Sequence, residues 1–292
     1  MAETQSSSLS GTIHAALIEN LLIAYQFDEA VVTAFFRFAS IADRSTTTAT
    51  FPRIVKSTGP TSGTPASETT ALSTTELTTT SVNVAVGRVG IAREITETAV
   101  EDSVFGRAMY TATFVQDAAR LYGEFFDTAS TALFSTVTAT VGTGGANLTI
   151  ATLMNAVAQQ RVNKARGQQI ISLHDHQAKQ LQQDQVAAQS TTWERFYNPS
   201  GSGGNYIGSF MMADIYSSGL NPTSAGDKLG AIWSNGRSSP EYCAFGFVIK
   251  RSPSSLTESH VLMDANVWAS FSRSGVGIIA NNFATSIRSV NA

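Results

Sequence analysis

Apolar side chains at helical spacing mark the first part of the chain. Between residues 11 and 41 they recur every three or four positions, which is the pattern of an amphipathic helix. The mostly polar stretch 26–29 interrupts the pattern, so we predict two helical pieces. The apolar positions are Ile13, Leu17, Leu21 and Tyr25, followed by Val31, Ala34, Phe35 and Phe38.

A second and longer helical pattern covers residues 94–134, with apolar residues from Ile95 to Leu133 in steps close to three and four. At 1.5 Å per residue, one continuous helix here would be roughly 60 Å long. Gly106 and Gly123 weaken it and allow a kink or break. Acidic residues crowd the first turns, where the helix dipole favours them, so we interpret them as a solvated helix start rather than a paired carboxylate site. They are Glu94, Glu97, Glu101 and Asp102.

Between the two helical patterns the chain is rich in Thr and Ser, with turn residues in the middle. Residues 80–86 alternate between polar and apolar, which predicts a strand, and residues 49–57 can pair with it. The turn residues are Gly59, Pro60, Gly63 and Pro65. We predict a long two-stranded hairpin, with a disordered linker as the alternative. An isolated hairpin is marginal in water, so it must lie on something.

The second half of the chain predicts a small α/β unit followed by strands. A helix begins at Asn147 or Thr149 and is capped by Gly167. A buried strand covers 169–173, and a third helix runs from Asp175 to Val186. Helix, strand and helix in this order favour an α/β unit. Residues 198–205 read as a loop, and further strands are expected within 206–216, 242–249, 261–267 and 275–279.

Composition changes this picture mainly through charge. Only 14% of the 292 residues are charged, against about 25% in ordinary soluble domains. This suits a surface covered by other subunits, although a secreted polar protein would fit too. The net charge of −3 and the absence of a basic run argue against sequence-specific binding of nucleic acid. Merely enclosing DNA needs no such run.

The lone cysteine and the hydropathy pattern bear on cellular location. Cys243 is the only cysteine, so no intrachain disulfide can form, as expected for a reducing cytoplasm. No signal peptide is recognisable, and no apolar run reaches the ~20 residues of a membrane span.

Candidate chemical motifs are few, and each has a simpler explanation. Gly275–Ala280 fits G-x-G-x-x-A, but only twelve residues follow, too few for a dinucleotide-binding unit. His174 and His176 flank Asp175 and could share a face, yet no third metal ligand stands at a useful spacing. Gly144-Gly145 and Gly203-Gly204 have no adjacent Lys or Arg to assist a phosphate. We therefore expect no catalytic, cofactor-binding or metal-binding residues.

Three segments of the chain carry recognisable local patterns. Residues 77–97 contain Gly90-Ile91-Ala92-Arg93-Glu94, residues 153–177 contain Ile170-Ile171-Ser172-Leu173-His174 and Gln177, and residues 204–222 contain Gly204-Asn205-Tyr206-Ile207-Gly208. These segments resemble the major capsid proteins of tailed phages of the Hong Kong 97 type. The family's proline in the turn after the second strand is missing, because His176 occupies that turn. The order of elements over residues 12–285 also matches the family.

The resemblance implies an α+β fold of five parts. These are an N-terminal arm over 1–48, an extended hairpin loop over 49–93, a spine helix with a peripheral domain over 94–146, an axial domain over 147–260, and strands returning to the peripheral domain over 261–292. Family members carry no catalytic residues.

The implied function is a major capsid protein. Copies would associate into hexamers and pentamers of an icosahedral head that encloses double-stranded DNA. Assembly would take place in the host bacterial cytoplasm, with no cofactor and no membrane. Scaffold, portal and decoration proteins are possible partners, and any scaffold is expected to be a separate protein. The alternatives are an encapsulin-like compartment, a tail or baseplate protein, or an enzyme with an unrecognised site.

Overall fold

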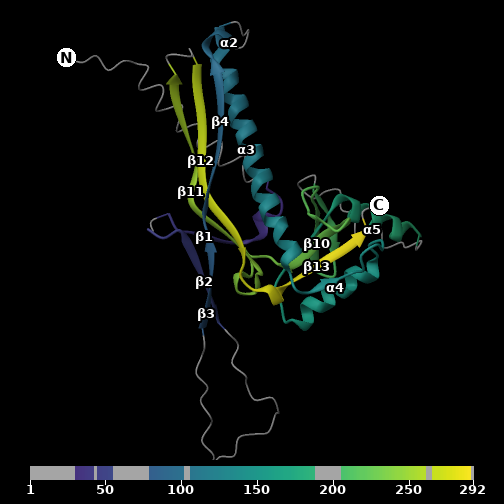
Figure 1. Ribbon diagram of the computed structural model, residues 1–292. Coiled ribbons are helices and arrows are strands. Elements are labelled where there is room, and N and C mark those ends of the chain that lie inside the picture. Colours follow the sequence, from purple (N-terminus) through teal and green to yellow (C-terminus); the bar gives the residue numbers. More distant parts are fainter. Residues whose placement is uncertain are drawn as a thin grey trace, which may run out of the picture.

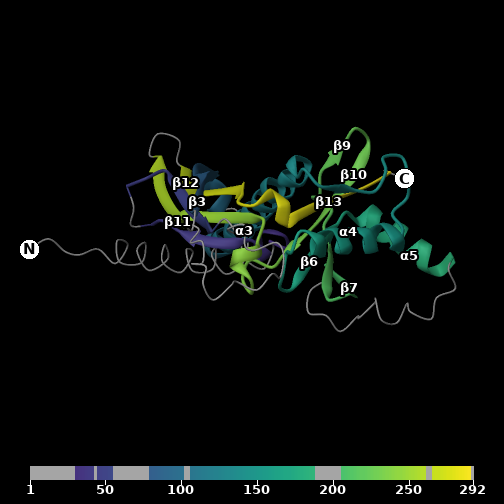
Figure 2. The ribbon, with the colours of Figure 1, turned by 90° about the horizontal axis from the view of Figure 1, so that it is seen from below.

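Two β-sheets and a two-stranded hairpin organise the chain in a computed structural model, which describes residues 30–42, 45–54, 79–101, 106–187, 205–260 and 265–290. An elongated sheet lies at one end of the molecule, and a lobe built on the second sheet lies at the other (Figures 1 and 2). The hairpin projects from the elongated part (Figure 1).

The elongated sheet has four strands in the order β1, β11, β12, β4. Strand β1 pairs in parallel with β11, and the other pairs are antiparallel. The long helix α3 (Gly106–Ala132) runs along this sheet (Figure 1). Its buried face joins Tyr122 and Phe126 to Phe247 and Trp268 of the sheet. The strands are β1 (Arg37–Ser40), β4 (Gly87–Thr96), β11 (Phe245–His260) and β12 (Ala265–Ile278).

The lobe contains a seven-stranded mixed sheet with two helices. The order is β5, β13, β10, β6, β8, β7, with β9 paired to β10. Apolar side chains of α4 pack on the central strands, where Leu153 and Val157 share a core with Ile171, Ile215 and Ile287. The elements are β5 (Thr140–Val141), α4 (Ile150–Val162), β6 (Gln169–Leu173), α5 (Asp175–Ala187), β7 (Tyr206–Phe210), β8 (Ala213–Ser217), β9 (Thr223–Ser224), β10 (Asp227–Ser234) and β13 (Ala284–Val290).

The predicted hairpin is present as β2 (Thr48–Ile54) paired with β3 (Thr79–Ala85). Its tip, residues 55–78, lies outside the described residues, as does the arm over 1–29. Short elements complete the fold: η1 (Thr33–Phe35), α2 (Glu97–Glu101), η2 (Leu133–Thr136), η3 (Pro240–Tyr242) and η4 (Asn281–Phe283).

The helical prediction is wrong over residues 31–40, which form a single 3-10 turn and strand β1. Two tertiary contacts override the apolar periodicity. The backbone of β1 pairs with Gly246–Ile249 of β11, and Phe36 stacks on Phe245 with ring centroids 4.9 Å apart. The β-branched side chains of Val31, Val32 and Thr33 also lower the helical propensity of this stretch.

The predicted start of the long helix at residue 94 is wrong by three residues. Glu94 lies in β4, and the short helix α2 begins at Glu97. Residues 102–105 are not described, and α3 begins at Gly106, one of the two predicted weak points. The residues before Glu97 form a strand because their backbone pairs with β12 over ten positions, from Gly87 to Thr96.

Sheet membership also corrects two expected boundaries. Strand β11 belongs to the elongated sheet, so the lobe does not extend to residue 260. The last strand, β13, returns to the lobe beside β10 and not to the elongated sheet. In the lobe, residues 206–216 form two strands separated by a turn at Met211-Met212. The first lobe helix ends at Val162, so Gly167 is not its cap and instead precedes β6.

Candidate assembly surfaces

Three glycines of the elongated sheet, Gly246, Gly275 and Gly277, lie where the base of the hairpin packs, and we call them the glycine seat. A Cβ atom at Gly275 would lie 2.0 Å from the carbonyl oxygen of Ala85, and one at Gly277 would lie 2.9 Å from the Val84 side chain. At Gly246 the added atom would meet Ile279 and Phe51. The backbone of β3 can therefore approach the elongated sheet only because side chains are missing there. These glycines include both from the apparent dinucleotide motif.

The glycine seat allows apolar side chains at the base of the hairpin to pack against the elongated sheet. Phe51 and Val84 are buried against Val248 and Ile279. The described hairpin ends at Ile54 and Thr79, and these contacts fix its base on the elongated sheet. The paired strands β2 and β3 point away from the lobe (Figure 1).

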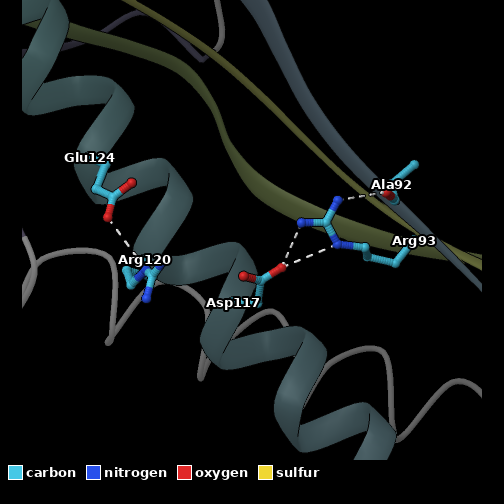
Figure 3. Close-up of polar contacts among 5 residues, drawn as sticks. All are labelled: Ala92, Arg93, Asp117, Arg120 and Glu124. Atoms are coloured by element: carbon cyan, nitrogen blue, oxygen red, sulfur yellow. Dashed lines mark hydrogen bonds and ion pairs between the residues drawn. The ribbon is translucent and has the colours of Figure 1, made fainter.

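The long helix is fixed to the sheet by polar as well as apolar contacts. The buried hydroxyl of Tyr122 donates a hydrogen bond to the carbonyl oxygen of Ser270 at 2.8 Å. At the surface, Arg93 of β4 forms an ion pair with Asp117 at 2.8 Å, and Arg120 pairs with Glu124 one turn further along (Figure 3). Polar contacts and apolar packing thus hold the helix on the elongated sheet.

At the other end of α3, Asp127 anchors the start of the described chain. This carboxylate is buried and accepts hydrogen bonds from the backbone N–H groups of Val31, Val32 and Thr33, and from the hydroxyl of Thr33. The sequence analysis missed this role. The available signal was an acid next to Phe126 in an apolar helical stripe, at a position that predicts burial.

A cavity of about 270 Å³ lies beside this anchor and is lined almost entirely by apolar side chains. We call it the arm groove. Its wall includes Phe38, which is 54% exposed although it is a large apolar residue. The lining residues are Ala30, Thr33, Ala34, Phe36, Phe38, Phe126, Arg237 and Phe247.

The two histidines lie at the start of α5 and not on one strand. The backbone N–H of His176 donates to Nδ1 of His174 at 3.1 Å, and the two rings stack with centroids 5.3 Å apart. Burial, with a smaller contribution from Lys228, lowers the pKa of His174 below its ordinary value. A nitrogen that accepts a hydrogen bond carries no proton, so His174 acts as a neutral helix cap.

Gln177, next to these histidines, is a structural residue that the sequence analysis did not interpret. Its side-chain oxygen accepts from the backbone N–H of His174, and its nitrogen donates to the carbonyl oxygens of Lys228 and Ile287. One buried amide therefore ties α5 to β10 and β13.

The remaining candidates do not converge on a site. Among the described residues, no three His, Cys, Asp or Glu side chains lie close enough together to hold a metal ion. Cys243 is buried, which raises the pKa of its thiol to about 11. Gly144 lies against Asp227, a carboxylate that would repel phosphate. Gly203-Gly204 lies outside the described residues. No helix in the described part of the chain is long and apolar enough to cross a membrane.

Comparison with known proteins finds no matching protein family and no similar curated sequence. Solved structures do match over nearly the whole chain. The capsid of Ralstonia phage GP4 has a TM-score of 0.64 at 9% identity, covering 88% of this chain and 87% of that one. The mature capsid of bacteriophage PhiM1 has a TM-score of 0.61 at 11% identity, covering 90% and 88%.

A virus-like particle from Pyrococcus furiosus also matches, with a TM-score of 0.58 at 10% identity, covering 93% of this chain and 98% of that one. The fold is thus shared with phage capsid proteins and with the protein of a virus-like particle. In particular, the chain has the Hong Kong 97-like capsid fold that its sequence resembles. At these identities the likeness establishes the fold alone.

Proposed function

We propose that this chain is the major capsid protein of a tailed phage, whose copies form the icosahedral shell around its double-stranded DNA. The observation that carries the proposal is the match to phage capsid structures over about nine-tenths of both chains. An accessory domain or an enzyme that borrowed part of the fold would match over a fraction only.

The surfaces described above support this role. The glycine seat fixes the base of a hairpin whose connecting residues 55–78 contain few large apolar side chains, and ordering such a segment costs about 1–2 kcal/mol of backbone entropy per residue. A neighbouring copy can offset that cost by covering it. The low content of charged residues fits a surface largely buried between copies.

The partners and location follow from the same proposal. Contacts that close on themselves give rings, as needed for hexamers and pentamers. DNA is enclosed without sequence-specific binding, and assembly takes place in the host bacterial cytoplasm. Scaffold, portal and decoration proteins would add to the shell.

Negative-stain electron microscopy of the purified protein tests the proposal. We expect hollow shells or capsomer-like rings, with a scaffold protein added if the chain requires one. A stable monomer at high concentration, with its native scaffold present, would contradict it.

A second candidate is a protein compartment without a viral genome, and the match to a virus-like particle from Pyrococcus furiosus over 98% of that chain is the observation that favours it. Particles purified from the native source separate the two. A phage head contains a DNA genome, whereas a compartment contains protein cargo and little nucleic acid.

A further inference from the structure

The arm groove is an apolar surface for which the chain itself carries a matching segment. Four phenylalanines and two alanines make up most of its wall. At about 270 Å³ it is smaller than the roughly 300–1,000 Å³ of small-molecule sites. It suits one or two inserted side chains rather than a free ligand.

The groove begins where the undescribed N-terminal residues end. Ala30, the first described residue, is part of its wall. Asp127 binds the backbone of the next three residues, so the chain enters the body at a fixed point on the groove's edge. Residues 1–29 are therefore tethered beside an apolar surface.

The sequence of this tethered segment matches the groove in hydropathy. Residues 13–25 place Ile13, Leu17, Leu21 and Tyr25 four apart, which predicts one apolar face on a helix about 20 Å long. Four residues, 26–29, separate this pattern from Ala30, and three of them are polar. Four residues are within the 2–8 common in connections between packed helices.

The charge of the N-terminal segment is also complementary to that of the groove. Residues 1–29 contain four acids and no Lys or Arg, and the acids are Glu3, Glu19, Asp28 and Glu29. Arg237 lies on the groove wall, and no ion pair to its guanidinium occurs among the described residues.

We propose that residues 13–25 of the same chain fold back and dock in the arm groove of the unassembled subunit, with their apolar face covering Phe38. The same chain is favoured over a second copy because a short tether gives an effective concentration in the millimolar range. This inference goes beyond the shell function, because the docking takes place within one subunit whether or not subunits later assemble.

A disulfide-trapping experiment on the full-length chain tests the docking. Ala24→Cys lies near the end of the segment, and Ser238→Cys lies on the exposed residue beside Arg237. The native thiol does not interfere, because Cys243 is buried and its pKa is about 11. The matched control pairs Ala24→Cys with Ser209→Cys, an exposed serine on β7 of the lobe.

Under a mild oxidant we expect an intramolecular disulfide between positions 24 and 238, seen as a faster-running monomer on a non-reducing gel and confirmed by mass spectrometry. Adding Leu17→Asp and Leu21→Asp should slow this disulfide at least about tenfold, because the tether remains but the apolar face is lost. The β7 control should not react within the molecule.

Two results would overturn the proposal. The first is an equal rate with and without the two aspartates, which would mean that only the tether brings the thiols together. The second is formation of disulfide-linked dimers and larger species, which would mean that the segment docks on another copy. Because the gel is run on unassembled subunits and shells are scored by microscopy, failure here and failure of the shell function are distinguishable.

Discussion

The lobe and the elongated sheet differ in how completely their strands are buried within the subunit. In the lobe, all five residues of β6 are buried, as are seven of the eight residues of β10. In the elongated sheet, β12 alternates between buried and half-buried residues over most of its length, and no residue of β4 is fully buried. The central strands of the lobe are thus covered within the subunit. In the elongated sheet, the edge strand β4 stays accessible to contacts with other molecules.

A matched pair of isoleucine truncations should show the difference most strongly. Ile171→Ala in β6 removes a fully buried side chain, and should lower the free energy of unfolding by about 2–5 kcal/mol. Ile91→Ala, at a half-buried position of the mostly exposed strand β4, should lower it by about 1 kcal/mol or less, since less apolar area is lost. Urea denaturation followed by tryptophan fluorescence measures both. Equal losses would contradict the contrast between the two sheets.

The glycine seat gives the next largest effect. Gly275→Ala would place a methyl group against the backbone of Ala85, and should cost about 1–3 kcal/mol through overpacking. We expect displaced hairpins and few complete shells by electron microscopy. The matched control is Gly87→Ala, where nothing lies within 4 Å of the added Cβ atom. Normal shells from the Gly275 variant would argue against the seat.

His174 should make the stability of the lobe depend on pH. Burial lowers its pKa in the folded protein, so below about pH 6.5 the unfolded chain binds a proton that the folded chain does not. Stability should therefore fall as the pH is lowered from 7 towards 5. His174→Gln removes this contribution, and thermal melts at several pH values should show a flatter dependence for the variant.

The smallest effect is expected at the Arg93–Asp117 ion pair on the elongated part. Both side chains are partly exposed, and such pairs contribute about 0.2–1 kcal/mol. Arg93→Gln should lower the free energy of unfolding by no more than this, and added salt should shrink the difference between variant and parent. A loss above 2 kcal/mol would show that the elongated surface is not as solvated as its exposure indicates.

Local patterns predicted several elements well, because the local and tertiary preferences agree there. Residues 169–173 contain Ile170, Ile171 and Leu173 between turn signals, and they form β6 as expected. Thr149 caps α4 through its side-chain oxygen, which accepts from the N–H of Thr152. The alternation over residues 80–86 likewise predicts β3, which occupies 79–85.

Other elements depend on partners far away in the sequence, which a local pattern does not contain. Residues 37–40 are a strand because β11 offers them an edge, and β13 was not predicted because its seven residues lack a strict alternation. The turn at Met211-Met212 has positive φ at both residues, 49° and 71°. Such turns favour Asn and Gly, so two methionines gave no signal there.

Some features of the candidate assembly surfaces could be predicted from the sequence, and others could not. The hairpin and the long helix were expected from periodicity. The glycine seat and the Asp127 anchor were not, because each depends on which backbone lies opposite, over a hundred residues away for Gly275 and more than ninety for Asp127.

The pairing of β1 with β11 has a consequence for how the polypeptide is made. Arg37 pairs with Gly246, a separation of 246 − 37 = 209 residues. During synthesis on the ribosome, β1 can therefore pair with β11 only after most of the chain has emerged. Loops of this length slow folding and leave strand edges open to misassociation. Translation thus sets the earliest time at which a subunit can become competent to join others, and a chain truncated before residue 245 should be a target for chaperones and proteases.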